Sequence, residues 1–136
     1  MFNNFDVSAS GLTAQRLRMD VIADNIANVN TTRTENGEPY RRKMPVFEEI
    51  LKREINQDKS GGVRVTQITE DQSDFKMVFR PNHPDANEEG YISMPNIDIT
   101  TEMIDMIDAS RAYEANVTAL NSAKDMALKA LEIGRG

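Results

Sequence analysis

The sequence predicts a mainly α-helical protein with a small β-rich insert, whose long N- and C-terminal helices pair as an antiparallel coiled coil. Apolar residues recur near both ends of the chain at the spacing of a coiled-coil seam, in steps of seven or of three and four. All five prolines lie between residues 39 and 95, outside both seams. We therefore expect one structural unit in three parts: an N-terminal coiled-coil helix over 1–30, a loop and β-rich insert over 31–99, and a C-terminal coiled-coil helix over 100–136.

The N-terminal helix is predicted from four apolar residues spaced seven apart, with two more on the alternate line of the seam. Asn3 or Asn4 would cap its start, and Asn28 or Asn30 would end it, because asparagine competes for backbone hydrogen bonds and tolerates the left-handed conformation. Gly11 disfavours helix by about 1 kcal/mol. It therefore indicates either close packing at that position or a frayed first turn.

The C-terminal helix is predicted from a longer seam with start and stop signals. No proline or glycine falls between Thr100 and Ile133, so a continuous helix over 100–133 would be about 50 Å long. Thr100 or Thr101 would cap its first turn, and Gly134 would stop it. One partner helix cannot cover the apolar surface of such a rod, which predicts contacts with further chains.

The two seams together define a predicted helix-packing interface. In the antiparallel arrangement the N-terminal seam packs on the C-terminal seam, and flanking apolar residues remain for other copies or other chains. The methionines among them have helical spacing, which favours packing positions over a promiscuous binding groove. The predicted interface consists of Phe5, Leu12, Met19, Ile22, Ile26, Val29, Met103, Met106, Ile107, Tyr113, Val117, Leu120, Leu128 and Leu131.

The insert is predicted to be loops and short strands. Alternating apolar and polar residues predict two strands, around 63–67 and 75–79, joined by the polar run 69–74, and a third strand over 91–94. Turn-forming residues predict loops over 31–43, 56–62 and 80–89. The segment 45–55 has two open interpretations, because Val46, Phe47, Ile50, Leu51 and Ile55 would share a helix face, whereas Val46 and Phe47 also suit a short strand.

A dense basic cluster, Arg41, Arg42 and Lys43, follows Tyr40. Two interpretations are open. The cluster is a solvated edge of a strand or loop, or it makes polar contacts with an acidic neighbouring subunit.

Composition argues against several classes of function. The formal net charge of -6 disfavours nucleic acid as a partner. With no cysteine and a single histidine, His83, the chain lacks the ligands and the nucleophile contexts of familiar metal sites and catalytic triads. We expect no enzyme, no cofactor, no metal and no small-molecule substrate. Apolar runs are too short to cross a bilayer, and the N-terminus lacks the pattern of a signal peptide, so we expect no membrane insertion and no cleaved signal peptide.

Several segments resemble one family. SGLTA at 10–14, MDVIADNIANVNTT at 19–32 and ASRAYEANVTALN at 109–121 are similar to the paired terminal signatures of the axial proteins of the bacterial flagellum. PYRRK at 39–43, RPNHPDANEEGYISMPN at 80–96 and EMIDMIDASRAYEANV at 102–117 resemble the proximal rod proteins of the basal body more specifically.

This resemblance implies a structural subunit of the proximal rod, which assembles through its terminal helices into the helical drive shaft that transmits torque. It implies export through the flagellar type III apparatus and a place in the periplasmic part of the basal body. The implied partners are that export apparatus, other rod proteins and further copies of the chain. A different class also fits the seams alone: a cytosolic coiled-coil adaptor or secretion chaperone, in which the same apolar faces bind one client.

Overall fold

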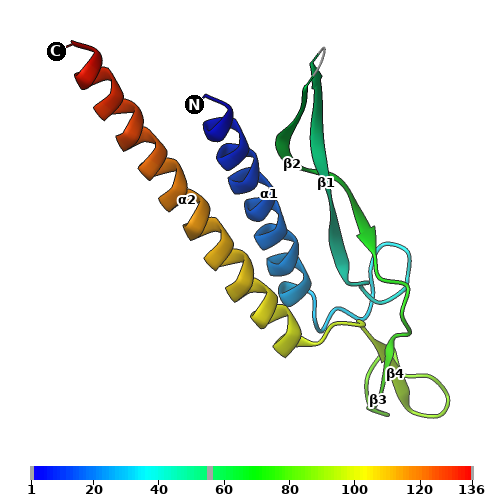
Figure 1. Cartoon of the computed structure of the whole chain (residues 1–136). Helices are drawn as coiled ribbons and strands as arrows, with labels where there is room; N and C mark the ends of the chain where they lie inside the picture. Colours follow the sequence, from blue (N-terminus) through cyan, green and yellow to red (C-terminus); the bar gives the residue numbers. More distant parts are fainter. Residues whose placement is uncertain (1, 55–56, 136) are drawn as a thin grey trace.

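A computed structural model describes residues 2–54 and 57–135 of the chain. It contains two long helices and four strands (Figure 1). The order is α1 (Phe2–Ala27), β1 (Lys43–Glu54), β2 (Gln57–Glu70), β3 (Lys76–Phe79), β4 (Tyr91–Met94) and α2 (Ile99–Arg135). The predicted class, mainly α with a small β insert between terminal helices, is confirmed.

The two helices lie side by side and run in opposite directions (Figure 1). Gly11 of α1 faces Asn116 of α2, whose side chain would lie 3.0 Å from an added Cβ. Two turns further along α1, the Ser110 hydroxyl donates to the sulfur of Met19 at 3.6 Å. Later residues of α1 thus meet earlier residues of α2. The close packing expected at Gly11 is confirmed, since only a residue without a side chain leaves Asn116 its full space.

The predicted end of α1 is confirmed, and its predicted start is wrong. The helix ends at Ala27, and the Asn28 side-chain amide donates to the carbonyl of Asp24 at 2.8 Å, which satisfies a carbonyl of the last turn. At the other end, the helix begins at Phe2, so Asn3 and Asn4 lie inside it and do not precede it.

Asp98 caps α2, and the predicted threonine caps are wrong. Its carboxylate accepts hydrogen bonds from the backbone N–H groups of Thr100 and Thr101 at 2.9 and 3.3 Å. Asp98 lies just before the first helical residue, where a side-chain acceptor reaches the free N–H groups of the first turn. Gly134 does not stop the helix, which runs on to Arg135.

The strands β1 and β2 form a long antiparallel hairpin that runs beside α1, on the side away from α2 (Figure 1). The strands have 12 and 14 residues, and the register shifts at two points in β1. The helical interpretation of 45–55 is therefore wrong over residues 45–54. The loop predicted over 56–62 is wrong over 57–62, which belong to β2. Predictions for Ile55 and Asn56 lie outside the described residues.

One glycine explains how this hairpin approaches α1. Gly62 has a positive φ of 105°, and an added Cβ would lie 2.1 Å from the Ser10 hydroxyl oxygen. The next residue, Val63, donates its backbone N–H to that same oxygen at 3.0 Å. Gly62 thus lets the strand pass close enough to α1 to be hydrogen-bonded to it.

The short strands β3 and β4 form a separate two-stranded sheet below the helices in Figure 1. The predicted strand over 91–94 and the loop after β3 are confirmed. The two strands predicted around 63–67 and 75–79 exist, but the first lies in β2, which pairs with β1, and the second pairs with β4. The polar run between them therefore connects two different sheets.

The buried apolar core is small. It draws on α1, on one alanine of α2, on β4 and on the segment that leads into α2. Among the described residues, the buried hydrophobic side chains are Ala14, Val21, Ile22, Ile92, Met94, Ile97 and Ala109. Because α1 lies between α2 and the β1–β2 hairpin, it is covered on two sides, whereas α2 is covered on one.

Candidate assembly interface

The residues of the predicted helix-packing interface lie at different depths. In α1, Ile22 is buried, while Phe5, Leu12, Met19 and Ile26 are half-buried, as is Val29 just beyond the helix. In α2 the half-buried members are Met106, Tyr113, Val117 and Leu120, and the exposed members are Met103, Ile107, Leu128 and Leu131. As an interface with other chains, the set stays a prediction.

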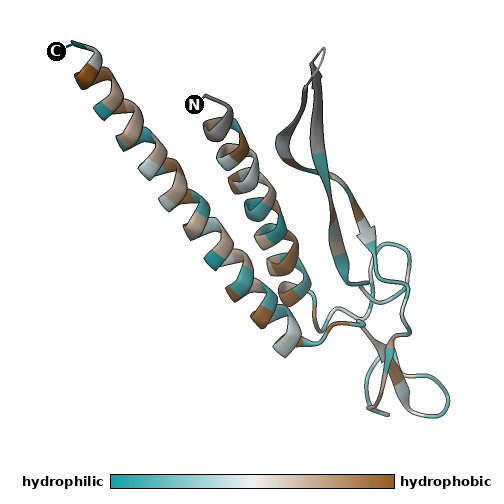
Figure 2. Ribbon diagram, viewed as in Figure 1, coloured by the Kyte–Doolittle hydropathy of each residue, from teal (hydrophilic) through white to brown (hydrophobic). Residues whose placement is uncertain are grey.

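The large apolar side chains of α2 that are exposed fall into two groups, one near each end of the helix, and Figure 2 colours the hydrophobic residues along this ribbon brown. The base patch consists of Ile99, Met103, Ile104 and Ile107. The tip patch consists of Met126, Leu128, Leu131 and Ile133. Along α2, all of which is described, the large apolar side chains that are exposed belong to these two patches, and none lies between residues 108 and 125.

The tip patch lies where α2 extends past α1. Since Gly11 faces Asn116, the start of α1 at Phe2 lies opposite about residue 125 of α2. The remaining residues of α2 extend beyond α1 by about 15 Å at 1.5 Å per residue. This accounts for the high exposed fractions of Leu131, 67%, and Ile133, 81%. Exposed apolar side chains gathered at one end of a helix are typical of a protein–protein contact.

At the other end of the helix pair, a buried polar cluster ties the insert to both helices. Glu102 of α2 is 0% exposed and Asn25 of α1 is 1% exposed. The Arg42 guanidinium donates to one carboxylate oxygen of Glu102, and Asn25 donates its side-chain amide to the other at 3.2 Å. A further guanidinium nitrogen of Arg42 lies 3.4 Å from the Asp105 carboxylate. The buried charge of Glu102 is therefore both paired and hydrogen-bonded.

Asn25 also holds the start of β1. Its side-chain oxygen accepts the backbone N–H of Lys43 at 2.9 Å, and its amide donates to the Lys43 carbonyl at 2.9 Å. The Tyr40 hydroxyl donates to the same side-chain oxygen at 3.3 Å. A buried side-chain amide with its donors and acceptors satisfied fixes the position of the segment that it binds.

The charges around Arg42 favour its protonated form. Burial alone would lower the pKa of Arg42, but the hydrogen bond and charge of Glu102, with Asp105 and Asp71, outweigh burial and raise that pKa above its usual value. Burial also raises the pKa of the Tyr40 hydroxyl, together with the nearby charges of Asp24, Glu102 and Glu70. Both groups therefore keep their protons in the folded subunit at neutral pH.

Neither interpretation of the basic cluster foresaw these partners within the chain. Arg42 pairs with Glu102, and the Arg41 guanidinium donates to the backbone carbonyls of Asp71 and Ser73, each at 3.2 Å. It also lies 4.2 Å from the centre of the Phe75 ring. Sequence reasoning missed Asn25 and the pairing of Glu102. The one signal was that both polar residues adjoin an apolar seam position, at Ile26 and Met103.

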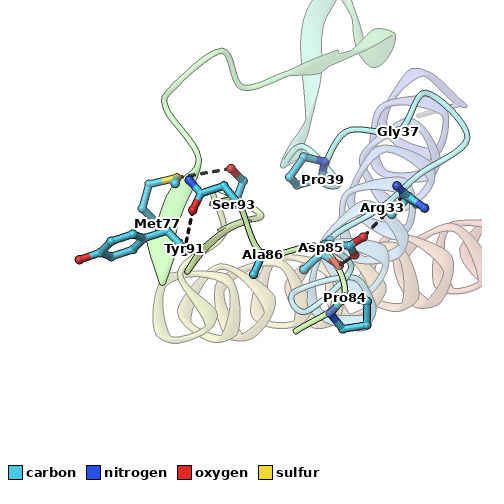
Figure 3. A pocket seen from close by; sticks show the side chains of 11 residues that line it. Arg33, Gly37, Pro39, Met77, Pro84, Asp85, Ala86, Tyr91 and Ser93 are labelled. Atoms are coloured by element: carbon cyan, nitrogen blue, oxygen red, sulfur yellow. Dashed lines mark hydrogen bonds and ion pairs between the residues drawn. The ribbon is translucent and has the colours of Figure 1, made fainter. Parts of the chain in front are cut away.

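An open cavity of about 360 Å³ lies between the loop after α1 and the β3–β4 sheet (Figure 3). The charged residues that line it pair with each other, Arg33 with Asp85 at 3.8 Å, and the Thr32 hydroxyl donates to Asp85 at 2.8 Å. Within the described ranges, no three His, Cys, Asp or Glu side chains are grouped as metal ligands, and no helix is long and apolar enough to cross a membrane.

An open apolar helix face beside a satisfied polar cluster is typical of a structural subunit that associates with other chains. Residues 5–33 match the family model for flagella basal body rod protein. Residues 88–133 match the model for the C-terminal region of the flagellar basal body rod FlgEFG proteins.

Three relatives named flagellar basal-body rod protein FlgC match nearly end to end. The chain is 51% identical to the protein of Bacillus subtilis, with 98% of each chain covered. It is 45% identical to the protein of Borreliella burgdorferi, covering 100% of this chain and 99% of the relative. It is 41% identical to the protein of Escherichia coli, covering 99% and 98%. The chain belongs to this family of flagellar basal-body rod proteins, and it is a structural subunit of the rod.

Proposed function

We propose that the chain builds the proximal rod of the flagellar basal body by packing its terminal helices against those of neighbouring subunits, and that the resulting helical shaft transmits torque. The observation that supports this most directly is the open face of α2, where Met103, Ile107, Leu128 and Leu131 are exposed by 51% or more. In the assembly these side chains would be covered by other rod proteins or by copies of the chain. Supercoiling of the helices into a coiled coil is part of the proposal.

Torque passes along a shaft only if its subunits do not slip. The contacts of α1 with α2 favour one register, because Asn116 fits only where Gly11 leaves space, and Asn25 reaches Glu102 only at one position. A shift of α1 along α2 would leave the Glu102 carboxylate buried without its partners, which is costly. Each subunit would therefore hold a fixed shape under load, and slip would have to occur between subunits.

We further propose that the chain reaches the periplasm through the flagellar type III export apparatus without cleavage of a signal peptide, and that it has no enzymatic activity. The absence of cysteine is compatible with this route, since folding after export requires no disulfide formation. Its small buried core also suits a chain that is exported unfolded and gains stability on assembly. We also propose the division of the chain into an N-terminal helix over 1–30, an insert over 31–99 and a C-terminal helix over 100–136.

The test is a single added charge on the open face. In cells that carry only the variant gene, we expect Leu131→Asp to abolish motility and the recovery of the chain with basal bodies, because a carboxylate cannot be buried in an apolar contact. The matched control is Asn121→Asp, which adds the same charge at an exposed polar position of α2. Normal motility with Leu131→Asp would count against assembly through this face.

The same cells distinguish the alternative of a cytosolic adaptor or secretion chaperone. A chain of that kind would be recovered from the cytosol as a soluble complex with one client. A rod subunit would sediment with the purified basal body, and Leu131→Asp would shift it out of that fraction.

A further inference from the structure

We infer that Asn36 is a site of spontaneous conversion to aspartate and isoaspartate, and that the turn in which it lies restrains this reaction in the folded subunit. Asn36 is the one asparagine of the chain that precedes a glycine. Both residues are exposed, and apart from chain neighbours no heavy atom lies within 4 Å of the place that a Cβ on Gly37 would take. Water therefore reaches both groups that the reaction needs.

The reaction involves the side-chain amide of Asn36, the backbone nitrogen of Gly37, hydroxide and water. The Gly37 nitrogen loses its proton to hydroxide and attacks the side-chain carbonyl carbon of Asn36. A nitrogen–carbon bond forms, the bond to the side-chain nitrogen breaks, and ammonia leaves, which closes a five-membered succinimide ring. Water then adds to either ring carbonyl and opens the ring, giving aspartate or isoaspartate. Glycine favours the attack because it has no Cβ to hinder its nitrogen.

The same two residues form a tight turn in the loop after α1. Gly37 has a φ of 77°, in the left-handed region, and its N–H donates to the carbonyl of Thr34 at 2.8 Å. The carbonyl of Glu38 accepts the backbone N–H of Thr34 at 2.8 Å and the Thr34 hydroxyl at 2.9 Å. A turn that ends in a left-handed residue favours asparagine followed by glycine, so the pair has a structural reason to be here.

These hydrogen bonds oppose the reaction. Attack requires a Gly37 nitrogen that has lost its proton, and in the turn that proton is bonded to the carbonyl of Thr34. The turn must therefore open before the ring can close. If opening costs the net strength of one or two hydrogen bonds, the folded chain should convert Asn36 about tenfold more slowly than the unfolded chain.

Conversion would change both the charge and the backbone of this turn. Either product places a carboxylate between Glu35 and Glu38, which are both exposed, and adds one negative charge to the net charge of -6. Isoaspartate also routes the backbone through its side-chain carbon and so lengthens the turn. Gly37 and Pro39 line the open cavity in Figure 3, so the isoaspartate form would alter one wall of that cavity.

Mass spectrometry of the purified full-length chain tests the site. Trypsin cleaves after Arg33 and Arg41, so Asn36 is recovered in a peptide of residues 34–41 that contains no other asparagine. The chain is incubated at mildly alkaline pH, either folded or in urea, before digestion. We expect this peptide to gain the mass of an amide replaced by an acid, about tenfold faster in urea than in the folded chain. Isoaspartate in the product is identified by labelling with protein isoaspartyl methyltransferase.

Two controls separate this site from general breakdown of asparagine. The peptide of residues 112–124, which contains Asn116 and Asn121, should stay unchanged over the same time, because neither asparagine precedes a glycine. Asn36→Gln keeps an amide at the position but lengthens the side chain, so the five-membered ring cannot form. The peptide of residues 34–41 from that variant should therefore keep its mass.

Thr34→Val distinguishes restraint by the turn from a property of the Asn36–Gly37 pair alone. The change keeps the shape of the side chain and removes the hydroxyl that donates to the carbonyl of Glu38. We expect conversion in the folded chain to become about threefold faster, with the rate in urea equal to that of the wild type. Thr118→Val, the same change at an exposed position of α2, should alter neither rate.

Three results would overturn the inference. If Asn36 converts no faster than Asn121 in urea, the glycine after it does not promote the reaction. Equal rates for Asn36 in the folded and unfolded chains would mean that the turn imposes no restraint. A folded Thr34→Val chain that converts at the wild-type rate would show that the hydrogen bonds around Thr34 do not control it. The proposed function is independent of all three results, since it does not involve residue 36.

Discussion

The two ends of the helix pair differ in how their side chains are satisfied. At the base, Asn25 and Glu102 are 1% and 0% exposed, and each has hydrogen-bond partners within the chain. At the tip, Met126 and Ile133 are 65% and 81% exposed, because α2 extends past the start of α1 there. The base therefore fixes the shape of one subunit, and the tip is free for contacts that one subunit cannot make.

Because of this difference, we expect changes at the base to affect the stability of the subunit and changes at the tip to affect its association with neighbours. A change at the base should unfold or distort the subunit whether or not neighbours are present, because it leaves a buried polar group without a partner. A change at the tip should leave the isolated subunit unaffected and alter only the assembly. The predictions below test this separation from the largest expected effect on folding to the smallest.

The largest effect is expected from Arg42→Met, which removes the cationic partner of a buried carboxylate. Glu102 would remain buried with its charge uncompensated, and the free energy of unfolding should fall by about 3 kcal/mol. The measurement is urea unfolding of the purified chain, followed by circular dichroism. The double variant Arg42→Met with Glu102→Leu should recover most of the loss, because an apolar pair replaces the ion pair. A loss below about 1 kcal/mol in the single variant would mean that water reaches Glu102.

A smaller effect at the base should appear as a dependence on pH. Hydrogen bonds from Ser73, with the charges of Arg42 and Arg41, lower the pKa of Asp71 in the folded chain. A carboxyl group whose pKa is lower in the folded state contributes stability above the unfolded value, about 3.9, and loses it as pH falls through the folded value. Asp71→Asn should therefore destabilise the chain at pH 7 and reduce the loss of stability on acidification below about pH 4.

The Asp71 effect should stay below about 1 kcal/mol, because the side chain is 28% exposed and its interactions are screened by solvent. Thermal unfolding at pH 7 and at pH 3 measures it, with Asp74→Asn as the control at an exposed carboxylate nearby. Identical pH profiles for Asp71→Asn and the wild type would show that Asp71 contributes nothing to the stability of the base.

The helices could be predicted from the sequence because their information is local. Heptad spacing and the absence of proline predict where both helices lie in the sequence, and Asn28 indicates the end of the first. The length of the β1–β2 hairpin could not be predicted, since Ser60, Gly61 and Gly62 have the composition of a turn. Gly62 belongs instead to a strand that passes Ser10 of α1, and that contact joins residues 53 positions apart.

The buried cluster was beyond sequence reasoning for the same reason. Arg42 and Glu102 are 60 positions apart, and Asn25 and Glu102 are 77 positions apart. No periodicity links a loop residue to a helix residue across such distances. A basic cluster in a chain that is acidic overall can pair with carboxylates of a neighbouring subunit as readily as with carboxylates of the same chain. By contrast, the prediction that α2 carries more apolar surface than α1 covers follows from residue type and spacing alone, and the exposed fractions agree with it.

The smallest effect on folding is expected at the tip. A substitution there is the sharpest test of whether the tip contributes to assembly and not to the stability of the subunit. Ile133→Asp replaces the most exposed of the large apolar side chains among the described residues, at 81%, on a part of α2 that α1 does not reach. Its free energy of unfolding should stay within about 0.5 kcal/mol of the wild type. The same chain should fail to join basal bodies, since Ile133 would be buried there against a neighbour. If instead Ile133→Asp lowers stability as much as Arg42→Met does, the tip is already packed in the isolated chain, and the contrast between the two ends of the helix pair is wrong.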